Sequence, residues 1–252
     1  MKYFIKYRIT IIEIIILLIF GITIYFTIDS DADCFENFIK DYFDIKTKYQ
    51  LIDKPKVVFQ TLPVMIFFFF HGIFFYKEWS IDNIYNLIRY DKRKKCCIKN
   101  LLSLLLVSIL ISLIFIASLC VIYILKSGNS HIDMLYFFSI FLSMSAVFYY
   151  MALLFSFISI NFGSLYGCFS TFIIWSLLVV FSLYISYECD NKFLLFMFRV
   201  IFPSVEEFYY IISEDHSYSI YIITFLQIAA LIIVNTLYTN KIDIGLTDKE
   251  AE

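Results

Sequence analysis

Six long apolar segments constrain the fold of this 252-residue chain more than any other feature. A helix needs about 20 apolar residues to cross the hydrocarbon core of a bilayer. Six segments meet or nearly meet that length: residues 9–28, 57–76, 101–125, 134–160, 168–187 and 219–238. Backbone groups in lipid must be satisfied within the segment, and membrane strands would be shorter and would alternate polar with apolar residues. The chain is therefore predicted to be an all-α, polytopic membrane bundle of six transmembrane helices.

Composition supports a single membrane domain. The chain is 61% hydrophobic, whereas a soluble domain is about half apolar, and its apolar residues fall in blocks rather than in short periodic stripes. The six predicted spans use most of the chain. Residues 1–252 are therefore expected to form one transmembrane domain with no separate soluble domain.

Positive charge is concentrated in two places. Lys2, Lys6 and Arg8 precede the first span, and residues 77–100 hold seven of the 20 Lys and Arg residues. Two spans separate these clusters, so both lie on the same face, and the positive-inside bias makes that face cytoplasmic. We expect a multi-pass protein of the cell (plasma) membrane with its N- and C-termini in the cytoplasm.

The segment between the first two spans is predicted to lie outside. It is too charged to enter the membrane, but five apolar residues recur at helical spacing: Phe35, Phe38, Ile39, Tyr42 and Phe43. Part of it is therefore expected to be an amphipathic helix. Cys34 lies in this segment and Cys189 in the other outer segment, so pairing of the two is one possibility and six independent thiols the other.

A second outer segment, residues 192–203, is apolar but too short to span and is interrupted by Arg199. Apolar stretches of about 10–14 residues are often interfacial or re-entrant. We expect an outer re-entrant or interfacial helix that includes Phe193 and Arg199 and ends near Pro203. A helix packed on the outer ends of the bundle is the alternative.

Glu13 is the main ionisable residue within a predicted span. A charge at the bilayer centre costs about 2.5–3.5 kcal/mol on insertion scales. Glu13 lies about one turn from the basic N-terminus, so it need not sit at that depth. It is expected to pair with a base such as Arg8, Lys77 or Lys99, or else to snorkel or be protonated at the interface.

Residues 77–100 divide into two parts. One face of the first part is apolar at i, i+3, i+4 and i+7: Ile81, Ile84, Tyr85 and Ile88. This spacing predicts a short amphipathic helix on the cytoplasmic surface. The charge cluster at residues 90–95 then predicts a basic turn that re-enters the membrane past Lys99. Periodicity alone fits both a helix lying on anionic lipid and a helix inserted in a cleft of a cytoplasmic ATPase.

With these elements the chain resembles, over nearly its whole length, the permease of type-2 ABC exporters. In that family a glutamate follows the second span, and a coupling helix, an arginine and a lysine precede the third. The matching positions are Glu78, the helix at residues 81–88, Arg89 or Arg93, and Lys99. One departure is that the glycine usual in the coupling helix is absent, and Asn83 or Asn86 stands there.

The resemblance implies a set of residues that couple the permease to its ATPase: Glu78, Trp79, Ile81, Ile84, Tyr85, Ile88 and Arg89. It implies cytoplasmic ABC ATPase subunits and a second permease copy or a sister permease as partners, with membrane lipids around them and no nucleic acid. The chain has no GxxxxGK[ST] loop, so no cofactor is expected to bind directly and a separate partner subunit would use the ATP. A peptide, drug or lipid-like substrate suits the aromatic-rich spans.

Two other functions are kept as alternatives. Glu206 and Glu207 are similar to the paired glutamates of CPBP-type intramembrane proteases, but no arginine follows a few residues on, and His71 is the one histidine within a predicted span. No catalytic residue or metal site is therefore expected.

A stand-alone membrane immunity or interaction protein without an ATPase partner would need only the lipid-facing interpretation of the cytoplasmic helix.

Overall fold

The computed structural model describes residues 21, 33–43, 93–128, 131–162, 166–174, 176–177 and 218–241. Every regular element within these ranges is a helix. The elements are α2 (Phe35–Phe43), α5 (Arg93–Ser127), α6 (Met134–Phe162) and α10 (Tyr218–Lys241), and residues 166–174 and 176–177 are also helical. The all-α prediction is confirmed for this part of the chain.

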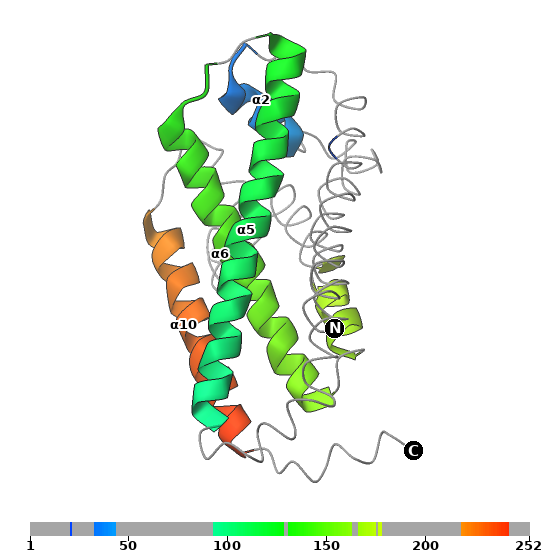
Figure 1. Ribbon diagram of the computed structural model, residues 1–252, viewed down its shortest axis with the longest axis vertical. Coiled ribbons are helices and arrows are strands. Elements are labelled where there is room, and N and C mark those ends of the chain that lie inside the picture. The colour runs from blue at the N-terminus through cyan, green and yellow to red at the C-terminus, as the bar shows by residue number, and fades with distance from the viewer. Residues whose placement is uncertain are drawn as a thin grey trace, which may run out of the picture.

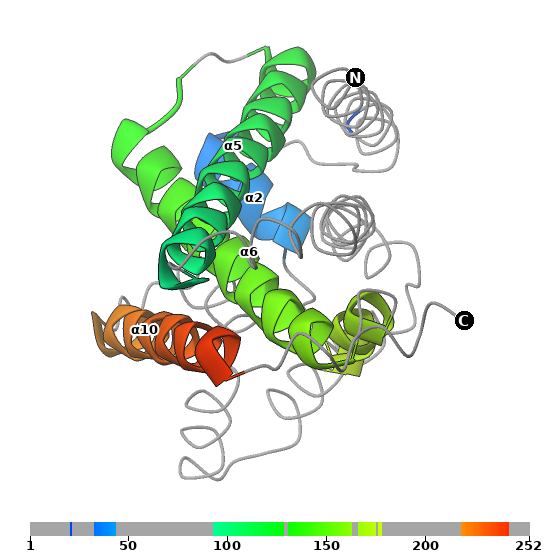
Figure 2. The ribbon, with the colours of Figure 1, turned by 60° about the horizontal axis from the view of Figure 1, so that its bottom comes forward.

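Helices α5, α6 and α10 lie side by side along the long axis of the molecule (Figures 1 and 2). α5 and α6 form an antiparallel hairpin, and α10 packs against both and runs in the same direction as α6 (Figure 1). The short helix α2 lies near the Ser127 end of α5, where the hairpin turns. The described helices therefore form a three-helix core with a small helix at one end.

The hairpin turn is specified by the residues at both helix ends. After α5, Gly128 adopts a φ of 65° and its N–H donates to the carbonyl of Ile124 at 3.0 Å. Glycine is the usual residue in this left-handed helix cap because it has no Cβ. At the start of α6, the Asp133 carboxylate accepts from the Leu135 N–H at 2.9 Å, which satisfies a backbone donor that has no partner within the helix.

Two helical stretches are long and apolar enough to cross a membrane, Cys97–Ser127 and Met134–Ser159. They confirm the predicted segments 101–125 and 134–160 as long apolar helices. The predicted segment 219–238 is helical within α10, and residues Ile222–Leu237 of it form an apolar helix.

The other predicted spans are described only in part. Within segment 168–187, residues 168–174 and 176–177 are helical. Segment 9–28 is described at Gly21 alone, and segment 57–76 lies outside the described residues.

The start of α5 corrects one prediction. The charge cluster at residues 90–95 was expected to form a turn, but α5 begins at Arg93 and continues to Ser127 without a break. Arg and Lys are good helix formers, and no Gly or Pro lies between Arg93 and Ser127 to stop the helix. Arg93, Lys94 and Lys95 are therefore in the first turn of a 35-residue helix.

Large apolar side chains lie on the outside of this core as well as in its interior, and several hydroxyl side chains are buried within it. Exposed residues include Leu106, Leu125 and Phe225, the last of which is 71% exposed. Ser108 and Ser112 on α5, by contrast, are fully buried. Soluble proteins place large apolar side chains inside, whereas helices that meet lipid keep them outside and place small and polar residues between helices. The distribution in the described helices is the one typical of membrane helices.

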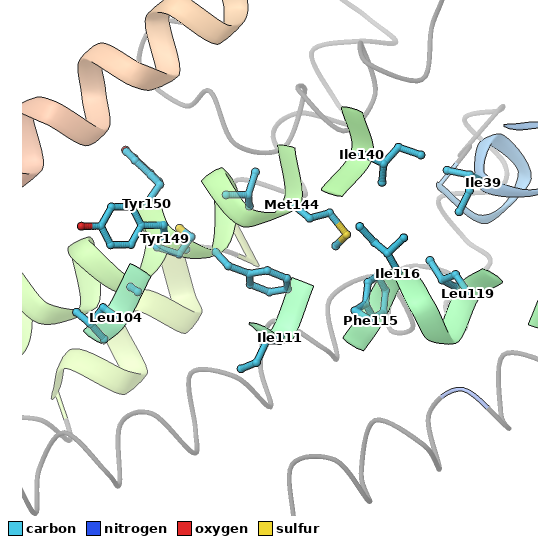
Figure 3. Packing of buried hydrophobic residues seen from close by; sticks show 14 of the residues in the cluster. Ile39, Leu104, Ile111, Phe115, Ile116, Leu119, Ile140, Met144, Tyr149 and Tyr150 are labelled. Atoms are coloured by element: carbon cyan, nitrogen blue, oxygen red, sulfur yellow. The ribbon is translucent and has the colours of Figure 1, made fainter. Parts of the chain in front are cut away.

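The hairpin is held by interdigitated apolar side chains. Figure 3 shows Met144 of α6 reaching toward Ile116 of α5, with Ile140 one turn away. At one end of the same row, Ile39 of α2 lies next to Leu119 of α5. All five side chains are no more than 4% exposed, so the core is continuous from the hairpin to α2.

Candidate functional site: the three-helix junction

Asn235 of α10 lies where α5, α6 and α10 meet, and its side chain is fully buried. Its amide Nδ2 donates to the carbonyl oxygen of Leu153 on α6 at 3.2 Å and to that of Leu231 on its own helix at 2.9 Å. The thiol of Cys97, four residues into α5, lies 4.0 Å from the Asn235 carbonyl oxygen. We call Cys97, Leu153 and Asn235 the three-helix junction.

The hydrogen bond from Asn235 to Leu153 fixes how α10 sits against α6. Placing an amide in an apolar environment without a partner costs about 4–8 kcal/mol, so the side chain strongly favours arrangements in which a carbonyl is in reach. A one-residue shift or a rotation of α10 would remove the Leu153 carbonyl from the amide. The junction therefore specifies the rotation and register of α10, in addition to contributing about 0.6 kcal/mol as an average interhelical bond in a membrane bundle.

Three other polar side chains of the core bond within their own helices. Ser108 and Ser112 donate to the carbonyls four residues earlier, both at 2.8 Å, and Thr236 does the same to Ile232 at 2.7 Å. Such bonds satisfy the hydroxyl hydrogen without joining helices. Among the described residues, the hydrogen bond from Asn235 to Leu153 differs from these in that it joins two long helices.

The opposite end of the core is covered by α2. Phe35 and Phe38 pack on the ring of Tyr123 with centroids 5.6 and 5.7 Å apart, and the Tyr123 hydroxyl donates to the Asp33 carbonyl at 3.4 Å. Together with Ile39 these two phenylalanines are almost fully buried. The amphipathic helix expected in the first outer segment is thus confirmed, and its apolar face packs on α5.

Two glycines mark close approaches of other segments to this core. A Cβ built on Gly21 would lie 3.8 Å from Ile122 Cδ1, so Gly21 lies close to α5 near its α2 end. A Cβ built on Gly167 would lie 3.1 Å from Ser159 Cα and would overlap the Ser159 hydroxyl. The helical residues after α6 therefore pack tightly on its last turns.

The residues predicted for ATPase coupling lie outside the described residues: Glu78, Trp79, Ile81, Ile84, Tyr85, Ile88 and Arg89. Glu13 also lies outside them, as do the residues of the predicted re-entrant helix, Phe193, Arg199 and Pro203. Of the proposed family matches, Lys99 is described with its side chain, and it is exposed on α5. Cys34 is a free thiol, and Cys189 lies outside the described residues.

Sequence reasoning did not single out Asn235. The available signal was an amide within the predicted span 219–238, because buried polar side chains in membrane helices commonly bond to a neighbouring helix. Neither the partner carbonyl of Leu153 nor the approach of Cys97 could be read from the sequence, since both depend on how the three helices pack.

Comparison of the chain with family models, curated proteins and solved structures finds no match in any of the three. The capacity of the junction must therefore be inferred from its own chemistry. An amide, a thiol and backbone carbonyls can hold three helices in one arrangement. A displacement of one of these helices would be transmitted to the other two through the contacts of the junction.

Proposed function

We propose that the chain is the membrane-spanning permease subunit of an ATP-driven type-2 ABC exporter in the plasma membrane. The subunit would have six spans with both termini in the cytoplasm. It would pair with a second copy or a sister permease, and two ATPase subunits would bind the cytoplasmic side. The partner subunits use the ATP, and the permease itself carries out no covalent chemistry. A peptide, drug or lipid-like molecule would pass between the two permeases.

The course of α5 is the observation that carries the proposal. α5 begins at Arg93, four residues after Arg89, where the predicted coupling surface ends, and runs unbroken to Ser127. At 1.5 Å per residue it is about 52 Å long, well beyond the hydrocarbon thickness of about 30 Å. It therefore tilts or extends past the bilayer. A long unbroken helix that directly follows a coupling segment is suited to carry a displacement from the ATPase into the bundle.

The exterior of the described helices also supports the proposal. Exposed leucines and phenylalanines cover α5, α6 and α10, as lipid-facing surfaces require. The hydroxyls of Ser108, Ser112, Ser143 and Ser145 bond within their own helices, so these four do not need water or cargo to satisfy them. A transport path at the seam between two permeases, rather than through this core, agrees with both observations.

Co-purification tests the proposal. The chain would be tagged, extracted from its native membrane in mild detergent and examined for a bound ABC ATPase by mass spectrometry. The double charge reversal Glu78→Arg, Arg89→Glu is expected to abolish binding. Glu36→Lys, an exposed charge on α2 at the other end of α5, is the matched control and should retain the ATPase.

Two results would contradict the proposal at different points. A wild-type chain that purifies with no ATPase would favour the stand-alone immunity or interaction protein. A double charge-reversal variant that still binds the ATPase normally would show that residues 78–89 are not the coupling surface.

A further inference from the structure

We infer that Asn235 is a positioning residue that makes the Arg93 end of α5 move together with α6 and α10. The inference rests on the proposed function, because the displacement it transmits would come from an ATPase acting on the segment before Arg93. It concerns how the movement spreads through the bundle, which the proposed function leaves open.

The geometry supports this role both where α10 meets α5 and where α10 meets α6. Cys97, on the second turn of α5, is 3% exposed, and its sulfur contacts the backbone of α10 at Asn235. The side chain of the same residue donates to α6 at Leu153. Asn235 of α10 thus contacts the start of α5, which is the end nearest the predicted coupling surface, and also donates a hydrogen bond to α6.

The amide chemistry explains why these contacts would persist during movement. Apolar contacts are non-directional, so helices that shift can exchange one set of them for another. The Asn235 amide instead loses its partner when α10 shifts against α6, and in an apolar interior an amide without a partner is expensive. The three helices are therefore expected to move as one unit.

Thr236 provides a matched control on the next position of α10. Its hydroxyl donates to Ile232 of the same helix at 2.7 Å. Thr236→Val removes a hydroxyl while keeping the branched shape. Asn235→Leu replaces the amide by an apolar group of similar size. Asn235→Ser is a second test variant, because its hydroxyl can bond Leu231 as the core serines do but is too short to reach Leu153.

The experiment measures whether α5 and α10 keep their separation. In a chain that keeps the buried Cys97 but lacks its other native cysteines, spin labels are placed on Leu102→Cys of α5 and Leu237→Cys of α10, both exposed positions. Their distance is measured by pulsed electron paramagnetic resonance in the complex with the co-purified ATPase, without nucleotide and with ATP plus vanadate.

In the otherwise wild-type chain and in Thr236→Val, the distance is expected to be single and unchanged by nucleotide. In Asn235→Leu and Asn235→Ser, a second distance should appear when nucleotide is added. For an average interhelical bond in a membrane bundle, the ratio of joined to separated helices should fall about threefold. ATPase binding should persist in all four proteins, because none of these substitutions touches residues 78–89.

The outcomes separate the two claims. If no ATPase accompanies the wild-type chain, the proposed function fails and the inference fails with it. If the ATPase is bound but nucleotide changes the wild-type distance, the inference alone is overturned. A single, nucleotide-independent distance in Asn235→Leu and Asn235→Ser would also overturn it, because the helices would then move together without the amide.

Discussion

The ring of Phe35 meets the ring of Tyr123 edge-on, with centroids 5.6 Å apart and planes inclined by 63°. Phe35 also meets Tyr136 edge-on at 6.4 Å, so one side chain of α2 contacts both arms of the hairpin. Edge-to-face pairs at such distances contribute about 0.5–1.5 kcal/mol beyond the area they bury. The position of α2 over the hairpin therefore depends strongly on Phe35.

Phe35→Ala is expected to release α2 from the hairpin. Truncating a buried phenylalanine costs about 3–5 kcal/mol, and a nine-residue helix is marginal in water without tertiary contacts. Hydrogen exchange of the α2 amides should therefore become much faster, while exchange in α5 and α6 changes little. Asn37→Ala, at an exposed position of the same helix, is the control and should leave α2 protected. Unchanged α2 protection in Phe35→Ala would show that other contacts hold the helix.

Tyr123→Phe separates the hydroxyl of this contact from its ring. The substitution removes the 3.4 Å hydrogen bond to the Asp33 carbonyl but keeps both aromatic contacts with α2. A neutral hydrogen bond contributes about 0.5–1.5 kcal/mol net, and this long one should lie at the low end. Hydrogen exchange of α2 should rise slightly in Tyr123→Phe and strongly in Tyr123→Ala. Equal effects of the two substitutions would contradict this division.

Local sequence patterns predicted the helices well where one pattern dominates. The spacing of Phe35, Phe38 and Ile39 indicated α2, and the long apolar runs indicated α5 and α6 to within a few residues at most ends. The start of α5 was missed because charge was taken as a sign of a turn. Arg93 and the two lysines after it are good helix formers, and they continue the helix beyond its apolar part.

Packing between helices could not be predicted in the same way. α5 and α6 are apolar around their whole circumference, so no stripe in the sequence shows which face meets which neighbour. The contact of Cys97 with Asn235 joins residues 138 positions apart, and only the fold brings them together. Residues 78–89, on which the coupling prediction depends, lie outside the described residues, so that prediction awaits the binding test.

Gly128→Ala is expected to destabilise the hairpin through its backbone alone. A Cβ at this position would meet nothing within 4 Å, so no clash contributes. The φ of 65° is nevertheless a left-handed conformation, which costs a residue with a Cβ about 1–2 kcal/mol. Gly128→Asn should cost less than Gly128→Ala because asparagine tolerates this conformation better. The measurement is the free energy of unfolding in mixed micelles, and equal stability of the wild-type, Ala and Asn proteins would contradict the cap assignment.

Gly167→Ala is expected to destabilise the bundle by a clash with Ser159. The new Cβ would overlap the Ser159 hydroxyl and lie 3.0 Å from its Cβ, in a site where Ser159 is 8% exposed and has little room to move. Overpacking of this kind costs about 1–3 kcal/mol. Gly21→Ala is the matched control, because its Cβ would make ordinary contacts at 3.8 and 3.9 Å and should be tolerated.

A double-mutant cycle tests whether the clash itself is the cause. Ser159→Gly removes both the hydroxyl and the Cβ, so Gly167→Ala should cost less in that background, and the two free energies of unfolding should be less than additive. Ser159→Ala removes the hydroxyl but keeps the Cβ, so it should relieve only part of the strain. The Ser159 hydroxyl has no hydrogen-bond partner among the described residues, so its loss carries no bond with it. Additive costs in both backgrounds would mean that Gly167 is required for a reason other than its contact with Ser159.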